Sequence, residues 1–165
     1  MMKKEYEETL RNMLCFVIGF CCAYMFFISV LSLFIVSGES MYPTFYDGDV
    51  LKCEKVTGGT IINRGDVVIF DCQMKKLVKR VVAISGDTVF IKDGILYVND
   101  APSVYNFDDP IEYAGLLEEP ITVKPQEYVC LGDNRNNSSD SRLFGPIKKD
   151  CINKRVKKVV FSMHN

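Results

Sequence analysis

The sequence predicts a mainly β fold, with one transmembrane helix at the N-terminus followed by a compact domain rich in β-sheet. Two observations support this prediction. Residues 14–36 contain no charged side chain, and the rest of the chain alternates short apolar runs with turns that contain glycine and aspartate. After Val36 no stretch of useful length shows the apolar period of 3.6 residues that is typical of a helix.

The apolar segment 14–36 is long enough to cross a lipid bilayer. At about 1.5 Å per residue a helix over this range spans roughly 34 Å, and the hydrocarbon core measures about 30 Å. A cleaved secretory signal is the alternative, but its apolar stretch usually has only about 7–15 residues. A helix buried in a soluble core is not favoured, since it would be apolar on every face and long for a domain this small. The segment therefore favours a retained anchor.

The charges beside the anchor predict its orientation. Lys3, Lys4 and Arg11 precede it, whereas the first basic residue after it is Lys52. Basic residues flanking a membrane helix tend to stay in the cytoplasm. We therefore expect a cytoplasmic N-terminus (1–13), a single-pass anchor in the cell membrane (14–36) and one extracytoplasmic domain (37–165).

The extracytoplasmic domain carries a series of strand signals. The clearest is Val89–Lys92, Asp93-Gly94, Ile95–Val98, since a two-residue Asp-Gly loop favours a type I′ hairpin. Residues 99–125 are acidic, irregular and rich in proline, which predicts a surface excursion. The other expected strands are 50–53, 67–70, 77–84, 127–131 and 156–161.

Charge and cysteine placement limit the possible partners. The net charge of −1 gives no reason to expect nucleic acid. The basic stretch 148–158 is either a solvated face or a contact with anionic lipid headgroups of the bilayer. Outside the anchor, the cysteines at 53, 72, 130 and 151 show no metal-ligand spacing, and both disulfide pairing and free buried thiols stay open.

Histidine is almost absent from this chain. His164, close to the C-terminus, is its one copy. This removes Ser–His–Asp catalysis, Cys–His proteases and most zinc hydrolases, so a hydrolase built from this sequence needs another base. We expect no metal and no cofactor.

Lys79 is the best candidate for such a base. On a strand its same-face neighbours are Leu77 and Val81, and burial among apolar groups lowers the pKa of a lysine toward neutrality. Arg80 has equally apolar neighbours but cannot lose its proton, so it can only pair with or position other groups. A lysine that extends its ammonium group to water is the alternative.

Ser40 lies where the chain leaves the membrane, in the sequence SGESMYPT. Gly38 permits a close backbone approach, and Pro43 stiffens the turn. This arrangement could present the Ser40 hydroxyl beside a backbone N–H that stabilises an oxyanion. A simple juxtamembrane turn is the other interpretation.

A third cluster of polar residues, GDNRNNSSDSR, covers residues 132–142 directly after an apolar strand. Its Asp, Asn and Ser side chains could simply cap turns, and Asp140 with Arg142 could form an ordinary loop ion pair. A set of hydrogen-bonding groups this dense also suits the surroundings of an active site.

The three clusters, in this order behind an anchor, resemble the bacterial type I signal peptidases. Four stretches carry the resemblance: SGESMYPT, RGDVVIF at 64–70, KRVVAISGD at 79–87, and GDNRNNSSDSR. The chain is similar to the small single-anchor members from Gram-positive bacteria. The resemblance implies a β-rich signal-peptidase-like domain, and a membrane-bound serine endopeptidase that removes N-terminal signal peptides from exported precursors.

The resemblance also implies roles for individual residues. Ser40 would be the nucleophile and Lys79 the general base of a Ser–Lys dyad, with Ser138 orienting the lysine. Some relatives have a serine two positions before the nucleophile that assists the oxyanion hole, and Gly38 occupies this position here. The Ser40 backbone N–H is then the expected oxyanion donor.

Other matched positions would support the dyad. Asp140 and Arg142 resemble the supporting pair, Asp133 a structural carboxylate and Met41 the residue that follows the nucleophile.

Two competing functions stay open. Self-cleaving repressors also use a Ser–Lys dyad, but they need a DNA-binding region where this chain has an apolar segment. A catalytically silent member of the family could act as an assembly factor for surface structures. An altered Ser40 or Lys79 would favour that reading, and both residues are present.

Overall fold

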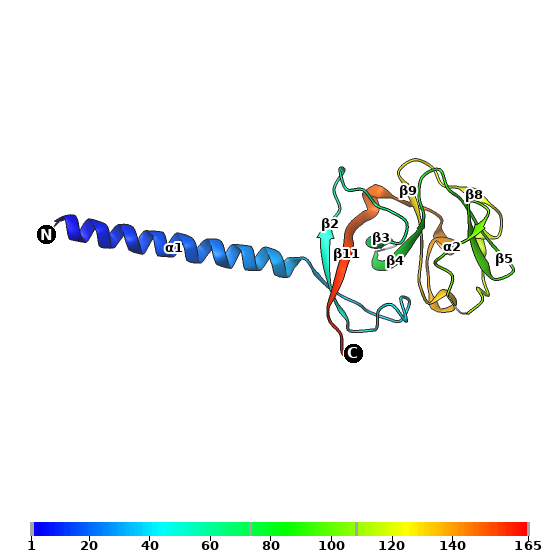
Figure 1. The fold of residues 1–165 in the computed structure, drawn as a ribbon, viewed down its shortest axis with the longest axis horizontal. Coiled ribbons are helices and arrows are strands. Elements are labelled where there is room, and N and C mark those ends of the chain that lie inside the picture. The colour runs from blue at the N-terminus through cyan, green and yellow to red at the C-terminus, as the bar shows by residue number, and fades with distance from the viewer. Residues whose placement is uncertain (1, 73, 108, 165) are drawn as a thin grey trace. The chain divides into compact units, whose positions relative to one another are not determined.

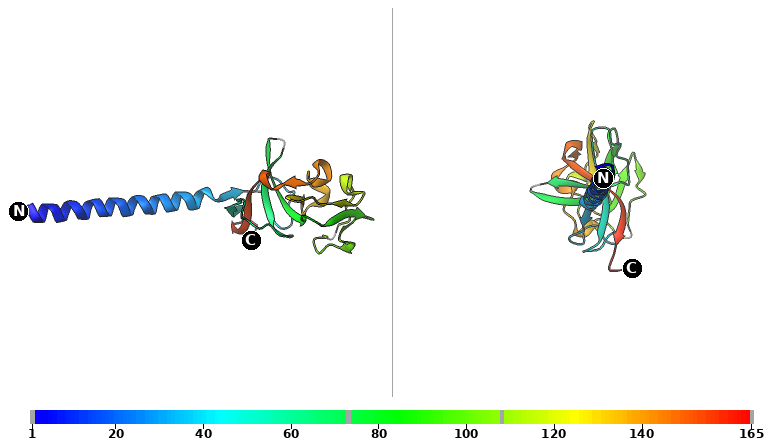
Figure 2. Two further views of the ribbon diagram at one scale, coloured as in Figure 1. Left: turned by 90° about the horizontal axis from the view of Figure 1, so that it is seen from above. Right: turned by 90° about the vertical axis from the view of Figure 1, so that its left-hand side faces the viewer.

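The computed structural model describes residues 2–72, 74–107 and 109–164, and the side chains of residues 2–4 and 28–31 lie outside this description. The side chains of Lys3 and Lys4, on which the predicted orientation of the anchor partly rests, therefore lie outside this description. The chain divides into two compact units, residues 1–33 and 34–165. Figures 1 and 2 show a single long helix in the first unit and β-sheet in the second.

The first unit is the helix α1 (Met2–Leu31). Its segment Glu5–Phe27 is long and apolar enough to cross a membrane, and it is the one such helix among the described residues. The helix shares residues 14–31 with the expected anchor. Strand β1 (Leu33–Ile35) follows, and Val36 is buried in the core of the second unit. Residues 33–36 of the expected anchor thus belong to a strand and to the core of the second unit, and the bounds of the membrane-spanning segment stay a prediction.

The described part of the second unit contains a seven-stranded sheet in the order β1-β2-β11-β3-β4-β9-β10. The strand pairs with a described register are antiparallel. The expected strands are all present (Figure 1). Several are longer than expected, whereas the strand at 127–131 keeps its bounds and the strand expected at 77–84 ends at Ala83. The expected strands of this sheet are β2 (Val50–Lys55), β3 (Val67–Cys72), β4 (Lys75–Ala83), β9 (Glu127–Leu131) and β11 (Ile152–Phe161). The short strand β10 (Ile147–Lys148) was not expected.

A second sheet of four strands, among the described residues, has the order β7-β6-β5-β8. Strands β5 (Thr88–Lys92) and β6 (Ile95–Val98) form the expected hairpin, with Lys92 opposite Ile95. Asp93 and Gly94 have φ values of 51° and 77°. Both are positive, as a type I′ turn requires. The remaining strands are β7 (Ala101–Pro102) and β8 (Ile121–Thr122).

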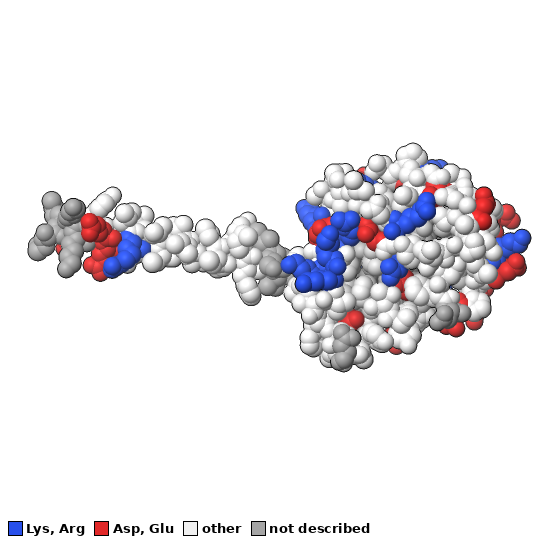
Figure 3. All heavy atoms as spheres, in the orientation of Figure 1, with Lys and Arg blue, Asp and Glu red and all other residues white. Residues whose placement is uncertain are grey.

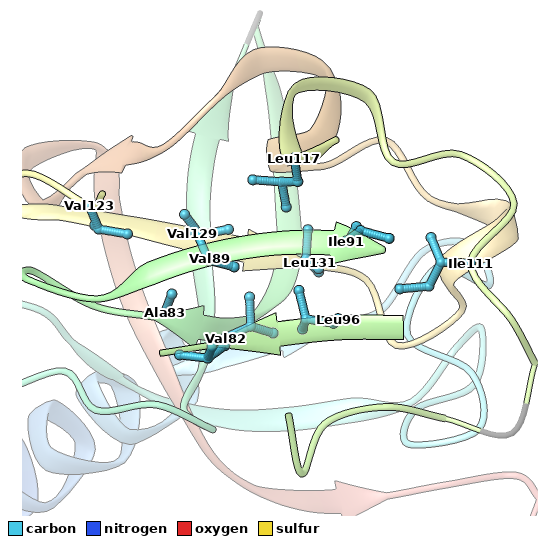
Figure 4. Packing of buried hydrophobic residues seen from close by; sticks show 11 residues of the cluster. Val82, Ala83, Val89, Ile91, Leu96, Ile111, Leu117, Val123, Val129 and Leu131 are labelled. Atoms are coloured by element: carbon cyan, nitrogen blue, oxygen red, sulfur yellow. The ribbon is translucent and has the colours of Figure 1, made fainter. Parts of the chain in front are cut away.

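The small sheet packs on one end of the large sheet through a shared apolar core (Figure 4). Val82 and Leu131, from β4 and β9, lie in this core with residues of β5 and β6. The prediction of a surface excursion over 99–125 is wrong in part. Leu117, on the 3-10 helix η1 (Gly115–Leu117), is fully buried there, and so is Val123. Burial of these apolar side chains fixes the excursion against the sheets.

Two further apolar clusters lie in the large sheet, and β4 contributes to both. Val78 joins the cluster that contains Met41 and Phe45, whereas Val81 joins the cluster that contains Phe70 and Cys130. Because successive side chains of a strand point to opposite faces, β4 separates these clusters. The described cysteines are free thiols, and Cys53 and Cys130 are buried.

Candidate active site

Ser40 and Lys79 meet although they lie 39 positions apart in the chain. Lys79 Nζ donates a hydrogen bond of 2.6 Å to Ser40 Oγ. Lys79 lies on β4, opposite Val68 of β3. Ser40 lies in the segment that leads from Val36 to β2, which we call the Ser40 loop (residues 37–47). The structure therefore brings together the two residues of the expected dyad.

Lys79 has little contact with water, since its exposed fraction is 2%. Burial is the largest influence on its pKa and lowers it from 10.5 to about 8, because the charged form is poorly solvated. The nearby carboxylates of Asp140 and Asp133 oppose this shift, and the guanidinium of Arg142 adds to it. The side chain thus holds a neutral amine in a useful fraction of molecules near neutral pH.

The Ser40 loop is fixed at both ends. Gly38 has a φ of 87°, a left-handed conformation that L-residues with a side chain rarely adopt, and its N–H donates to Asp47 Oδ1 at 2.7 Å. Met41 is buried in the core, and its carbonyl accepts from Phe45 N. The Tyr42–Pro43 peptide bond is cis. The contacts of Gly38 and Met41 hold the loop on both sides of the serine, and Pro43 lies in the same loop.

The segment after β9, which we call the 132–142 loop, packs against the Ser40 loop. Asn134 N donates to Ser40 O at 3.1 Å, and Asn134 Nδ2 donates to Glu39 O at 3.2 Å. The approach is close at Gly132, where an added Cβ would lie 2.2 Å from Ser138 Oγ and 2.6 Å from Ser40 O. A residue with any side chain would force these two loops apart.

Ser138 is close to the dyad but its expected contact is not seen. Its Oγ is buried and has no hydrogen-bond partner among the described residues. The resemblance implied that it orients Lys79, and the hydrogen bond described for Lys79 goes to Ser40 instead. A buried hydroxyl without a partner costs free energy, which is typical of a site that binds a further polar group.

Asp140 and Arg142 form a buried ion pair within the 132–142 loop. Arg142 Nε and Nη2 donate to the two carboxylate oxygens of Asp140 at 2.8 Å each, and the side chains are 3% and 0% exposed. Asp140 also accepts from Gly132 N and caps the short helix α2 (Ser141–Phe144). This pair is therefore no solvated loop contact.

The buried Asp133 forms a second ion pair, with the partly buried Arg80 of β4. Arg80 Nε and Nη2 donate to its carboxylate at 2.8 and 2.6 Å, and Thr44 Oγ1 donates to it at 2.6 Å. Arg80 is the strand neighbour of Lys79. The pair therefore joins the strand of the lysine, the Ser40 loop and the 132–142 loop, which suits the structural role expected for Asp133.

Arg135 also belongs to this assembly, and the sequence reasoning did not single it out. It is buried, donates to Gly132 O at 2.8 Å and to Tyr105 O at 2.5 Å, and stacks on Phe107. It thus holds the 132–142 loop against the excursion. Its place inside the polar motif 132–142 could have indicated a role in the site, but no sequence pattern indicated its partners Tyr105 and Phe107.

The geometry allows acyl transfer. A neutral Lys79 amine could accept the hydroxyl proton of Ser40, and the Ser40 backbone N–H has no acceptor among the described residues, which leaves it able to stabilise an oxyanion. The described residues contain no group of three His, Cys, Asp or Glu side chains placed to hold a metal ion.

Comparison with known proteins identifies relatives over most of the chain. The family described as signal peptidase, peptidase S26, matches residues 9–161. Signal peptidase I of Bacillus caldolyticus is 35% identical, over 97% of this chain and 93% of that protein. Signal peptidase IB of Staphylococcus aureus strain COL is 33% identical, over 92% and 87%.

A solved structure is also similar in sequence. The crystal structure of a signal peptidase I from Enterococcus faecalis has a TM-score of 0.47 and 25% identity, over 56% of this chain and 94% of that one. The family match and the curated relatives confirm the resemblance found in the sequence. This chain belongs to the signal peptidase family, peptidase S26.

Proposed function

We propose that this protein is a membrane-bound serine endopeptidase that removes signal peptides from exported precursors, with Ser40 as nucleophile and Lys79 as general base. The observation that carries the proposal is the hydrogen bond of 2.6 Å between Lys79 Nζ and Ser40 Oγ, formed by a lysine that is almost fully buried. A catalytically silent assembly factor would not need this arrangement, because burying a lysine without an ion-pair partner destabilises the fold.

The reaction follows from the positions of these groups. As Ser40 Oγ attacks the scissile carbonyl carbon, its proton passes to Lys79 Nζ, and the carbonyl oxygen becomes an oxyanion beside the Ser40 N–H. Collapse of this intermediate breaks the C–N bond, and Lys79 gives the proton to the leaving amine. Water then attacks the acyl carbon and loses a proton to Lys79. The ester bond to Ser40 Oγ breaks, Lys79 returns this proton to Ser40 Oγ, and the signal peptide leaves with a new carboxyl group.

Two ion pairs hold this geometry. Asp140 with Arg142 lies within the 132–142 loop, and Asp133 with Arg80 joins this loop to the strand of Lys79. Ser138 Oγ would accept a hydrogen bond from Lys79 once the amine has taken its proton, and this would satisfy the buried hydroxyl.

A bilayer is the expected surface for this domain. Exposed apolar side chains occur on β1 (Ile35) and at the end of β11 (Val159, Val160 and Phe161). Lys and Arg side chains gather over β2 and β11 on the face in Figure 3. Lipid headgroups and acyl chains can take up both kinds of surface. We place the N-terminus in the cytoplasm and this domain on the extracytoplasmic side.

Cleavage of a precursor peptide tests the proposal. Purified protein in detergent should cleave a peptide with Ala at −1 and −3, because export cleavage sites carry small residues there. Ser40→Ala should lose turnover and still bind the peptide. Equal cleavage of a peptide with Phe at −1 would contradict the substrate class, and full turnover by Ser40→Ala would contradict the nucleophile.

A further inference from the structure

A groove with acidic and aromatic walls lies beside the Ser40 loop, outside the dyad. Its volume is about 620 Å³, within the range of pockets that bind small ligands. The acidic residues Glu39 and Asp47 line it, together with the aromatic residues Tyr42, Phe45, Tyr46 and His164. No Lys or Arg side chain lines it among the described residues.

The aromatic rings form a connected wall. Tyr42 and Tyr46 meet edge to face with ring centroids 5.4 Å apart, and Tyr46 stacks on His164 at 4.7 Å. The faces of the two tyrosine rings carry partial negative charge and attract cations within about 6 Å. The wall therefore favours a positively charged group with an apolar stem.

The two carboxylates of the groove are not neutralised. Neither Glu39 nor Asp47 forms an ion pair with a basic side chain among the described residues. Asp47 Oδ1 accepts from Gly38 N, and its second oxygen stays available. Two carboxylates beside the rings of Tyr42 and Tyr46 suit the side chain of a lysine or an arginine.

The groove adjoins the nucleophile. Glu39 is the neighbour of Ser40, so their Cα atoms lie about 3.8 Å apart. Asn134 lines the groove and also donates its backbone N–H to Ser40 O. A peptide whose scissile bond lies at Ser40 therefore passes within reach of this groove, which favours the substrate over other cations as the occupant.

We propose that this groove is a specificity site for a lysine or arginine side chain in the first few residues after the cleavage point. This rests on the proposed function. The residues before the cut are small or apolar in export signals, so a charge near the cut comes from the mature part. Basic residues are disfavoured on the exported side of a membrane segment, so only some precursors carry one just after the cut. The groove would therefore favour this subset of precursors.

Cleavage kinetics with matched peptides test this site. One peptide series, with Ala at −1 and −3, carries Lys, Gln or Glu singly at each position from +1 to +4. The enzymes are the full-length wild type in detergent, Glu39→Gln, and Glu119→Gln as a control at an exposed site away from the groove. At the preferred position the wild type should cleave the Lys peptide with a kcat/KM about fivefold above the Gln peptide.

The preference should have the signature of an exposed electrostatic contact. It should reside in KM, weaken with added salt, and fall to about twofold or less in Glu39→Gln while Glu119→Gln keeps it. Lys and Gln peptides cleaved within twofold of each other by the wild type at every position would overturn this site and leave the proposed function intact. Absence of cleavage of every peptide would overturn both.

A lipid headgroup is the competing occupant, and the same variants identify it. The assays are repeated in vesicles of a zwitterionic lipid, with or without an amine-headgroup lipid. If Glu39→Gln changes all peptides by the same factor, and only where the amine lipid is present, the groove holds a headgroup and the specificity site is wrong.

Discussion

Replacing Lys79 by methionine, a side chain of similar length without a charge, separates the chemical role of the lysine from its effect on the fold. The structure gives this lysine a pKa of about 8, lowered mainly by burial. At pH 7 about one tenth of the molecules then hold a neutral amine, compared with roughly one in 3000 for a lysine with a pKa of 10.5. Burial thus raises the population of the base roughly 300-fold.

The rate consequences follow from this population. The wild-type rate should rise about tenfold per pH unit below pH 8 and reach a plateau above it. Lys79→Met should lower turnover by at least about a thousandfold, since it removes the general base. Lys79→Arg should do the same although it keeps the charge, because a guanidinium stays protonated.

Lys79→Met should stabilise the fold, although it lowers the rate. Above pH 10.5 the lysine is neutral in the folded and the unfolded chain, and burial costs nothing. Between pH 10.5 and 8 the unfolded chain binds a proton that the folded chain does not, so the wild type loses about 3 kcal/mol as the pH falls. Lys79→Met should therefore be more stable than the wild type by up to this amount at pH 7, and by almost nothing above pH 10.5.

Two measurements check these expectations. Peptide cleavage between pH 6 and 10 gives the rate profile. Denaturant unfolding at pH 7 and pH 10.5 gives the stabilities, followed by circular dichroism because the chain has no tryptophan. Lys76→Met is the matched control, because Lys76 lies on the same strand with a side chain that is 62% exposed. It should change neither the rate profile nor the stability. A rate midpoint near 10.5, or Lys79→Arg within about tenfold of wild type, would refute the assignment.

Three further predictions concern the surroundings of the dyad. Asp140→Ala should cost about 3–5 kcal/mol and lower turnover, since it leaves Arg142 buried without its partner, and an unchanged melting temperature would contradict this. Gly132→Ala should reduce turnover by about 10²-fold by separating the two loops, whereas Gly58→Ala, with no atom within 4 Å of the added Cβ, should not. Chelation should leave full activity, and loss restored specifically by zinc would indicate another mechanism.

The strands could be predicted from the sequence because each one carries its own signals. Turn residues bound the apolar runs, and the Asp93-Gly94 hairpin forms as expected with both φ values positive. The burial of Leu117 and Val123 could not be predicted, because isolated apolar residues between prolines show no period. Their burial depends on a second sheet, whose packing is a long-range property.

For the candidate site, the sequence identified the groups but not their contacts. The apolar neighbours of Lys79 predicted its burial correctly, since strand alternation is local. The ion pair of Asp133 with Arg80 joins residues that are 53 positions apart, and the contacts of Arg135 reach into the excursion. Such contacts depend on strand order and on loop packing, and a local sequence pattern predicts neither.

The ion pairs also explain how a lysine can stay unpaired beside two carboxylates. Asp140 and Asp133 both raise the pKa of Lys79, and a direct contact with either would fix the ammonium form and remove the base. Arg142 and Arg80 instead occupy these carboxylates through bidentate hydrogen bonds. A guanidinium matches a carboxylate better than an ammonium does and cannot itself become neutral. The two arginines therefore keep the acids away from Lys79, and burial can then lower its pKa.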